Sequence, residues 1–409
     1  MPGGRHRREA VTPTRESRRT VPVAVLGAAF LFNVGQGVLR PSMPLYLERT
    51  FAANYRMVTL IPVVFGAGKW VASLPTGYLL RRMGRPLMIG GLLVIACVDV
   101  ASIAVARFDL FLVLRGLGGL GWAMFATVAT TAVVDGPAAR RRGRAVSVLL
   151  MSETLGLLLG SAAGGWLYQG VGVGSPFLFE AACMIVAAAT VARWASLTRN
   201  AAAPIRESPN RGSLGAVLRT RGVLLMGTIN ALLTAIQTGV LVFLFPLYLA
   251  KRGGLGAEGI GVLVSLSVLG RLAALWFGGD VSDRWGRLRV LVPGLLIYAV
   301  LLGGVSVVGS PLVLGVLSFS LGAAAGFVAA IPTALVSDQV PRELHGVAIG
   351  WLRMMTDGGQ IVGPLLMGAL ADAIDLSAPF ILGAALLAAA AWGCRRAAAV
   401  LPESASGSP

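Results

Sequence analysis

The chain has 409 residues, of which 56% are hydrophobic and only 13% are charged, and its mean hydropathy is +0.78. Soluble domains usually carry about 25% charged residues, so this composition excludes an ordinary soluble domain and favours an integral membrane protein. The formal net charge of +17 could suggest a nucleic-acid partner. Because the arginines gather in the N-terminal tail and in every second loop, they predict membrane topology instead.

Apolar runs of about 20 residues are long enough to cross a bilayer as helices, and the sequence holds twelve of them. Strands of a membrane barrel need only about 10 residues, so the lengths predict helices and an all-α integral membrane protein. The expected spans are 21–47, 57–80, 87–106, 109–134, 145–169, 176–197, 222–249, 258–280, 289–309, 311–336, 347–371 and 378–400.

The first run could be taken for a signal peptide, because a basic tail precedes an apolar core. It contains Asn33 and Gln36, exceeds 20 residues and leads into eleven further runs, so we interpret it as the first transmembrane helix. The three cysteines lie in apolar runs and the two histidines in loops. This pattern indicates neither a disulfide framework nor a metal site, and we expect no cofactor.

The positive charges alternate between loops. One set of loops carries many arginines, and the intervening loops carry few. By the positive-inside rule the rich loops and both termini are cytoplasmic, which an even number of spans also requires. We therefore expect a multi-pass protein of the cell (inner) membrane, surrounded by lipid. The rich segments include Arg5, Arg7 and Arg8, Arg140 to Arg142 with Arg144, and Arg395 with Arg396.

The chain repeats itself. Pro44 in "MPLYL" matches Pro246 in "FPLYL" at an offset of 246 − 44 = 202 residues. Two copies of six helices joined by a basic, polar linker explain this repeat, which is typical of transporters. We expect a basic tail (1–20), a first six-helix bundle (21–197), a linker (198–221), a second bundle (222–400) and a short tail (401–409).

Four motifs lie on this repeat. The loop after 258–280 contains Gly279, Asp283, Arg284, Gly286 and Arg287, and its first copy contains Gly77, Arg82, Gly84 and Arg85, with Arg81 in place of the aspartate. "LVLRGLGGLG" in 109–134 contains Arg115. Glycine-rich stretches in 145–169 and 347–371 contain Gly156, Gly160 and Gly164, and Gly359, Gly363 and Pro364. With these motifs in this order, the chain resembles the major facilitator superfamily, and in particular its drug/proton antiporter-type branch.

The resemblance implies two pseudo-symmetric six-helix bundles around a central cavity that opens alternately to each side. It also implies a cytoplasmic gate, in which an aspartate meets the N-terminal end of a helix in the opposite bundle. Asp283 would fill that role, with Arg284 or Arg287 near Asp338.

In the first copy of the gate, Arg82 or Arg85 could meet Asp135, whereas Arg81 has the wrong sign for such a latch. The alternative is that these arginines only fix the topology.

Charges within the spans are functional candidates, since each costs at least ~2.5–3.5 kcal/mol in mid-bilayer. Lys69 and Arg271 are repeat equivalents, because 271 − 69 = 202. The family's architecture predicts two pairs between bundles, Lys69 with Asp357 and Arg271 with Glu153, which break or titrate as the bundles rock. Alternatively the pairs are static, and Arg353 could pair with Asp357 within its own helix.

Further charged residues lie in the first bundle. Asp99 could carry a proton or could simply accept hydrogen bonds from a neighbouring helix. Arg115 resembles the family's arginine that is linked to proton coupling. We expect Glu180 and Arg40 to lie nearer the outer ends of their spans, where burial costs less.

In the family, the cavity is lined by the first, fourth, seventh and tenth helices. Their mid-span polar and aromatic residues here are mostly neutral, which favours a lipophilic or neutral solute, although each residue could instead bond a neighbouring helix. These residues are Asn33, Gln36, Trp122, Thr127, Asn230, Thr234, Gln237, Ser318 and Ser320. Glycines that recur every fourth residue predict close helix packing.

We therefore predict a monomeric secondary transporter that couples the efflux of lipophilic molecules or drugs to protons. The alternative is an importer or facilitator of a small metabolite such as a sugar or organic anion, the anion being attracted by Lys69 and Arg271 if these lack acidic partners. A third candidate is a membrane sensor that kept the fold. We find no nucleophile triad, nucleotide loop or metal cluster, so we expect no enzyme and no direct drive by ATP.

Overall fold

The computed structural model describes residues 23–134, 142–193, 220–341 and 345–398, and all regular secondary structure within these ranges is helical. The helices follow the twelve predicted spans in order. They are α1 (Val23–Phe51), α2 (Tyr55–Ala104), α3 (Phe108–Val134), α4 (Arg142–Gly170), α5 (Ser175–Arg193), α7 (Arg221–Ala235), η4 (Ile236–Leu244), α8 (Phe245–Lys251), α9 (Ala257–Trp285), α10 (Arg287–Gly304), η5 (Val305–Val307), α11 (Pro311–Ala329), α12 (Ile331–Gln339), α13 (His345–Ala373) and α14 (Ala378–Ala398).

The repeated loop separates two helical segments in both copies. In the first copy, α2 includes both of the spans that we expected at 57–80 and 87–106, and the helical geometry is broken between them at Met83 (φ −135°, ψ 36°), where we expected a turn. In the second copy, α9 and α10 are separated at Gly286, which adopts φ 90° and ψ 132°. A positive φ of this kind strains residues with a Cβ atom, so the second turn requires glycine.

Two spans are interrupted in mid-course. The span that begins with α7 passes through the π-helix η4 before it ends in α8. Here Gly239 lies close to α13, since a Cβ on Gly239 would be 3.1 Å from the backbone of Gly363 and Pro364. The other interrupted span consists of α11 and α12, which meet at Ala330. Both interruptions lie in the second half of the chain.

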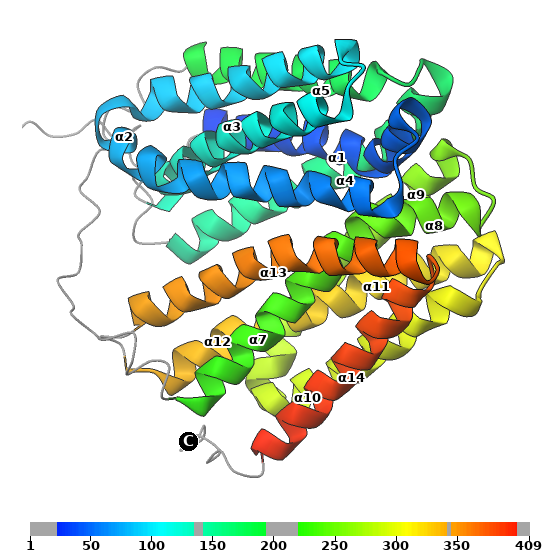
Figure 1. Cartoon of the computed structure of the whole chain (residues 1–409). Helices are drawn as coiled ribbons and strands as arrows, with labels where there is room; N and C mark the ends of the chain where they lie inside the picture. The colour runs from blue at the N-terminus through cyan, green and yellow to red at the C-terminus, as the bar shows by residue number, and fades with distance from the viewer. Residues whose placement is uncertain (1–22, 135–141, 194–219, 342–344, 399–409) are drawn as a thin grey trace, which may run out of the picture.

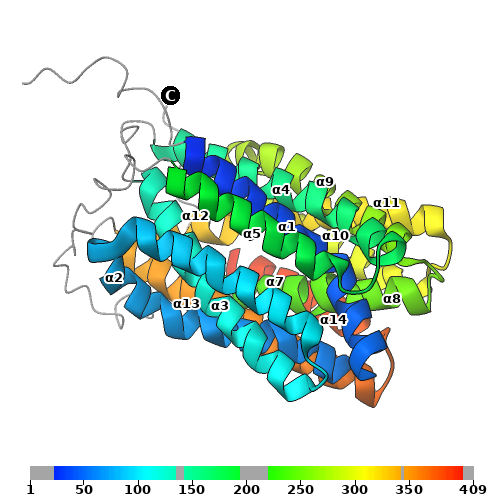
Figure 2. The same ribbon diagram turned by 90° about the horizontal axis from the view of Figure 1, so that it is seen from above.

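The helices form two halves, α1 to α5 and α7 to α14, which Figure 1 shows as an upper and a lower group and Figure 2 shows from above. In the first half α1 packs on α4 and α2 on α3, and in the second half α7 packs on α13 and α9 on α11. The repeated helices therefore have repeated neighbours, and the predicted all-α fold of two pseudo-symmetric bundles is confirmed.

Glycines permit these crossings. A Cβ on Gly160 of α4 would be 2.0 Å from the carbonyl oxygen of Val34 in α1. A Cβ on Gly359 of α13 would be 2.1 Å from the carbonyl oxygen of Ala231 in α7. Gly156 and Gly164 face α1 in the same way, and Gly363 faces α7 at Ala235. The predicted glycine faces thus bring helices together within each half.

The two halves also touch each other, and we call the end where they do so the short-loop end. It comprises the loops at 52–54, 105–107, 171–174, 252–256, 308–310 and 374–377, which lie at the right in Figure 1. A Cβ on Gly165 of α4 would be 2.1 Å from the carbonyl oxygen of Ala257 in α9. A Cβ on Gly368 of α13 would similarly meet Thr59 of α2.

The outer surface of the molecule is apolar. Ten helical segments among the described residues are long and apolar enough to cross a membrane. Large side chains such as Val300, Leu312 and Trp166 are exposed on them, at 74%, 80% and 57% of their surfaces. Exposed apolar surface of this extent requires a non-aqueous neighbour. The protein is therefore a multi-pass membrane protein.

We predict that Gly160→Ala destabilises the first half, because its methyl group would overlap the Val34 carbonyl. Overpacking of this kind costs about 1–3 kcal/mol, and thermal unfolding in detergent measures the loss. Gly27→Ala is the matched control, since a Cβ on Gly27 has no neighbour within 4 Å. Equal unfolding temperatures for the two variants would contradict the crossing geometry.

Candidate functional site

A cavity of about 510 Å³ lies between the two halves. Five of the residues that we predicted for it line its wall, namely Gln36, Trp122, Asn230, Thr234 and Gln237. The remaining wall is partly apolar and partly cationic: Leu39, Arg40, Met43, Ile61, Pro62, Phe65, Lys69, Arg115, Leu233, Thr238, Val242, Phe243, Arg271, Tyr298, Ala325, Ala329, Thr356 and Gln360. The volume suits a small organic molecule.

Four predicted cavity residues do not line the cavity: Asn33, Thr127, Ser318 and Ser320. Asn33 donates to the carbonyl oxygen of Ala29 at 2.9 Å and lies beside Gly156 of α4. Ser318 is fully buried and donates to the carbonyl oxygen of Leu314 at 2.7 Å. Each side chain therefore donates to a carbonyl oxygen of its own helix. The rotation of a helix about its axis decides which of its faces lines the cavity.

The π-helix η4 supplies part of the wall. Gln237, Thr238, Val242 and Phe243 all come from its nine residues. A π-helix advances its side chains by a different angle from an α-helix, and such segments are frequent at functional sites. No sequence pattern indicated this change in winding, and we expected one uniform helix over 222–249.

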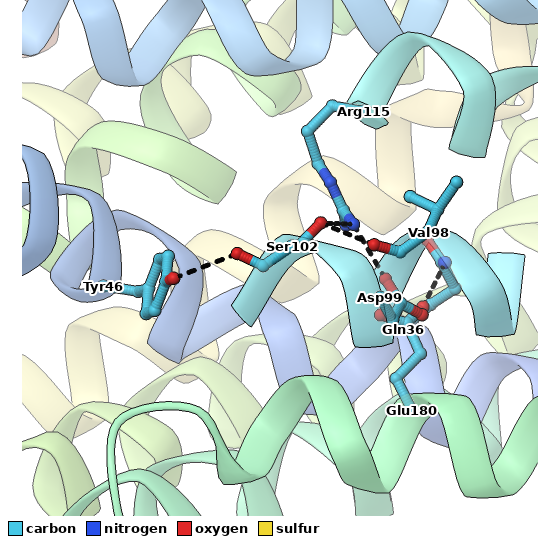
Figure 3. Close-up of polar contacts among 7 residues, drawn as sticks. All are labelled: Gln36, Tyr46, Val98, Asp99, Ser102, Arg115 and Glu180. Carbon is cyan, nitrogen blue, oxygen red and sulfur yellow. Dashed lines mark hydrogen bonds and ion pairs between the residues drawn. The ribbon is translucent and has the colours of Figure 1, made fainter. Parts of the chain in front are cut away.

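A buried ionic cluster adjoins the cavity (Figure 3). Arg115 of α3 donates to Asp99 Oδ1 of α2 at 2.9 Å and to Ser102 Oγ at 2.7 Å. The side chain of Asp99 is 0% exposed and that of Arg115 is 6% exposed. Asp99 and Ser102 are three residues apart, so both point from one face of α2 toward Arg115. The ion pair compensates for the burial of each charge.

A second acid joins this cluster, and we had not predicted it. Glu180 of α5 is 0% exposed, although we expected it near the outer end of its span. Gln36 of α1 donates to Glu180 Oε1 at 2.6 Å. The carboxyl groups of Asp99 and Glu180 lie within hydrogen-bonding reach of each other. Burial rather than sequence position marks Glu180 as a member of the site.

The two carboxyl groups leave one oxygen each without a donor. Among the described residues no group donates to Asp99 Oδ2 or Glu180 Oε2, although both atoms are buried. Ionised carboxylates only accept hydrogen bonds, so neither acid can satisfy the other while both are charged. One proton placed on either acid creates the missing donor and removes the repulsion between two negative charges.

Lys69 lies in the cavity wall beside α13, as the predicted bundle contact requires, but its partner differs. Its Nζ donates to Gln360 Oε1 at 2.7 Å and lies 4.5 Å from the ring centroid of Trp122. Asp357 is near enough for its charge to act on Lys69, but Gln360, three residues later, makes the direct contact. Arg353 is exposed and does not line the cavity.

The second predicted pair is not formed. Arg271 of α9 lines the cavity, whereas Glu153 of α4 does not. No ion pair joins Arg271 to Glu153 or to any other described acid. Arg271 lies close to another cation, Arg40 of α1. We expected Arg40 near the outer end of its span, but it also lines the cavity.

The basic loops show part of the predicted gate. Arg287 forms an ion pair with Asp338, in which Nη2 is 3.5 Å from Oδ1. Arg85 donates to the carbonyl oxygens of Val191 and Ala192 in the last described turn of α5.

Other gate predictions lie outside what the structure describes. Asp135 falls outside the described residues. So do the side-chain positions of Gly77, Arg81, Arg82, Gly279 and Asp283. Gly84, Arg284 and Gly286 are described and lie at the same end of the molecule as Arg287.

Helix N-termini join the halves at the short-loop end. Asp372 of α13 accepts from the backbone N–H groups of Tyr55 and Arg56 in α2, each at 2.9 Å. Gln169 of α4 accepts from the N–H of Glu258 in α9 at 3.2 Å. The two contacts are repeat equivalents, since 372 − 169 = 203 and 258 − 56 = 202. We call these two contacts the terminal seal.

An ion pair accompanies the terminal seal. Lys251 at the end of α8 lies 2.7 Å from Glu48 near the end of α1. Its two partners come from different halves, so the pair adds to the closure of this end. Sequence patterns did not reveal the terminal seal, because capping by a distant residue leaves no local signal.

The α13–α14 loop at this end is held by an acid. Arg252 Nη2 lies 3.0 Å from Asp375 Oδ1, and the N–H of Ser377 donates to Asp375 Oδ2 at 3.2 Å. Hydrogen bonds from the Ser377 side chain and backbone lower the pKa of Asp375 to about 2, because they stabilise its charged form. The carboxylate therefore remains charged at physiological pH.

No cluster of three or more potential metal ligands occurs among the described residues. Two pseudo-symmetric helical bundles with a cavity between them define the class of protein, a secondary transporter of the membrane. The model of the Major Facilitator Superfamily matches residues 25–258 and 227–408. The chain belongs to the major facilitator superfamily.

Individual proteins resemble the chain over most of its length. It is 26% identical over 382 residues to "Multidrug resistance protein MdtG" of Escherichia coli (strain SMS-3-5 / SECEC), covering 90% of this chain and 92% of the relative. The crystal structure of the nucleoside transporter NupG superposes with a TM-score of 0.77 at 13% identity, covering 92% of this chain and 99% of NupG.

A second solved structure has the same fold. It is a bacterial homolog of the human lysosomal transporter Spinster, crystallised in an inward-facing and unoccupied conformation. Its TM-score is 0.73 at 14% identity, with 95% of this chain and 96% of that chain covered. At these identities the two solved structures show the fold of this protein and no more.

We predict that Asp372→Ala loosens the short-loop end, because two N–H groups of α2 lose their acceptor. Loss of a helix cap costs about 0.5–2 kcal/mol, which raises exposure of the closed end about 2- to 30-fold. A cysteine placed at buried Ala53, with the three native cysteines replaced by alanine, reports this as faster labelling by an impermeant maleimide.

Asp109→Ala is the control for this experiment. Asp109 is an exposed acid of the same end, but its partner Arg107 belongs to the same half. Labelling at equal rates in both variants would contradict the role of Asp372.

Proposed function

We propose that the protein couples the efflux of lipophilic small molecules to protons by alternating access. The observation that carries this proposal is the Asp99–Glu180 pair, two buried acids with one arginine between them and the cavity. The name of the relative MdtG, a multidrug resistance protein, supports efflux as the direction of transport. Both termini are proposed to lie in the cytoplasm, with the short-loop end outside.

The proton acts through residues that the substrate can reach. Gln36 and Arg115 line the cavity, and each also bonds one of the two acids. With a proton on the pair, Arg115 needs to balance only one negative charge. When the proton leaves, two carboxylates compete for Arg115 and Gln36, which are then withdrawn from the cavity. The protonation of the pair therefore decides how far Gln36 and Arg115 are available to a substrate, which links substrate binding to the proton.

The terminal seal gives the cycle a reversible closure. Its acceptors are an acid and an amide, and its donors are helix N-terminal N–H groups, which water can satisfy when the seal opens. Contacts between the halves extend inward as far as Lys69 with Gln360 and Ser265 with the carbonyl oxygen of Leu158. We propose that the cavity lies beyond these contacts and communicates with the cytoplasmic side in this conformation.

A second candidate function is the import or facilitated passage of a small polar metabolite. It is favoured by the amide and hydroxyl groups of Gln36, Asn230 and Gln237 in the cavity wall. Such groups suit a solute with several hydrogen-bonding atoms. The two candidates differ in the direction of the proton flow that substrate addition causes.

We predict that a lipophilic substrate added to acidified everted vesicles dissipates the pH gradient, read with a quenched acridine dye. Asp99→Asn and Glu180→Gln should each slow this response at least about tenfold, since a shared proton needs both carboxyl groups. Exchange of labelled substrate across vesicles without a gradient should persist in both variants, because the cavity remains intact.

Asp109→Asn serves as the control, since it neutralises an exposed acid away from the cavity. If both variants retained full proton coupling, the role of the acid pair would be refuted. Proton movement in response to sugars or nucleosides but to no lipophilic compound would establish the second candidate instead.

A further inference from the structure

Two arginines line the cavity without an ion pair to any described acid. Arg40 comes from α1 and Arg271 from α9, so they approach from opposite halves. Neither forms an ion pair with a described residue. They are close enough for their like charges to oppose each other. Two cations in a partly buried, low-dielectric site are costly unless an anion joins them.

The cavity wall offers no such anion of its own. Among the described residues that line it there is no aspartate or glutamate. Of its other cations, Arg115 is balanced by Asp99, and Lys69 bonds Gln360 near Asp357. Arg40 and Arg271 therefore give the described wall a net positive charge that an anionic occupant of the cavity would balance.

A hydroxyl group adds a donor beside them. Tyr298 of α10 lines the same cavity, is 1% exposed, and its hydroxyl has no hydrogen-bond partner among the described residues. Its charge state and that of Arg271 influence each other, so the two groups are neighbours. Arginine binds oxyanions in a two-pronged geometry, and a tyrosine hydroxyl can donate to a further oxygen.

Apolar residues line the same cavity. Leu39 and Met43 flank Arg40 on α1, and Val242 and Phe243 come from η4. A cavity of about 510 Å³ that is lined by both cationic and apolar side chains fits an amphipathic organic anion. An inorganic oxyanion would use only the cationic side chains.

We propose that the substrate is an organic anion, with a carboxylate, phosphonate or phosphate group held by Arg40, Arg271 and Tyr298 and an apolar body against the wall. This inference rests on the proposed function in that the cavity is the transport site. Since the two arginines belong to different halves, the anion links the halves directly. Its arrival and departure then change the electrostatic attraction between them.

Binding to the purified protein in lipid nanodiscs tests the charge of the substrate. The probes are 2-naphthoate, neutral 2-naphthamide and cationic 2-naphthylmethylamine, which share one apolar body, together with inorganic phosphate. We expect calorimetry to show 2-naphthoate binding at least about tenfold more tightly than 2-naphthamide, with no detectable binding of the amine. A tenfold preference corresponds to about 1.4 kcal/mol, a modest demand on two arginines.

Substitutions then assign the preference to its residues. Arg40→Gln and Arg271→Gln should each reduce the ratio of the naphthoate to the naphthamide affinity about tenfold, and Tyr298→Phe should reduce it less. Arg193→Gln, which removes an exposed charge at the end of α5, should leave the ratio unchanged. Both affinities are measured on the same protein sample, so their ratio is still obtained from a partly unfolded variant. Arg271→Lys provides a second variant, which keeps the positive charge.

The proposal fails if naphthamide binds as tightly as naphthoate, or if the preference survives in the Arg40→Gln/Arg271→Gln double variant. It also fails if phosphate alone binds as tightly as naphthoate, since the apolar wall would then contribute nothing. These assays require no proton gradient. Anion binding without proton-coupled movement would refute the proposed coupling and leave the anion site standing, and the converse result would refute only the anion site.

Discussion

The burial of charge in a medium of low dielectric constant is the constraint on which this structure depends. An ionised group away from water is costly unless it has a partner, and in the first half of this protein the partners come from other helices. Asp99 and Arg115 meet this demand across α2 and α3, while Gln36 and Glu180 extend the cluster to α1 and α5. The cluster thus ties four helices of the first half into one body and at the same time stores two acids beside the cavity.

The framework around this cluster is symmetric. Gly160 lies where α4 crosses α1, and Gly363 lies where α13 crosses α7. The two glycines are repeat equivalents, since 363 − 160 = 203. Both halves are therefore assembled by equivalent close contacts. The terminal seal follows the same symmetry, with helix N-termini as donors in both copies. Contacts that use backbone groups persist when side chains diverge. This explains why the two halves share their architecture although their polar side chains differ.

The chemistry is divided unequally between the halves. In the described residues the acid pair belongs to the first half, whereas Arg271 and Tyr298 come from the second. Lys69 and Arg271 occupy equivalent places in the repeat, yet Lys69 contacts Gln360 and Arg271 faces the cavity beside Arg40. Two buried acids in the first half, and one arginine from each half in the wall of the cavity, are the arrangement from which both proposals derive.

The sequence by itself determined the class and the architecture. Apolar length predicts spans, an offset of 202 to 203 residues predicts two copies, and glycine spacing predicts close crossings, because each depends only on local chemistry and periodicity. A glycine at 286 is likewise readable as a turn, and the structure needs its positive φ there. Even the contact of Lys69 with α13 was anticipated, although its direct partner is Gln360 rather than Asp357.

Only the tertiary structure decided which polar side chains meet. Asp99 and Glu180 are far apart along the chain, and Arg40 and Arg271 lie in different halves, so no local pattern joins them. Periodicity places a residue on a face of its helix, but the rotation of that helix against its neighbours decides what the face meets. The π-helical turns of η4 alter those rotations, and no sequence pattern singled them out.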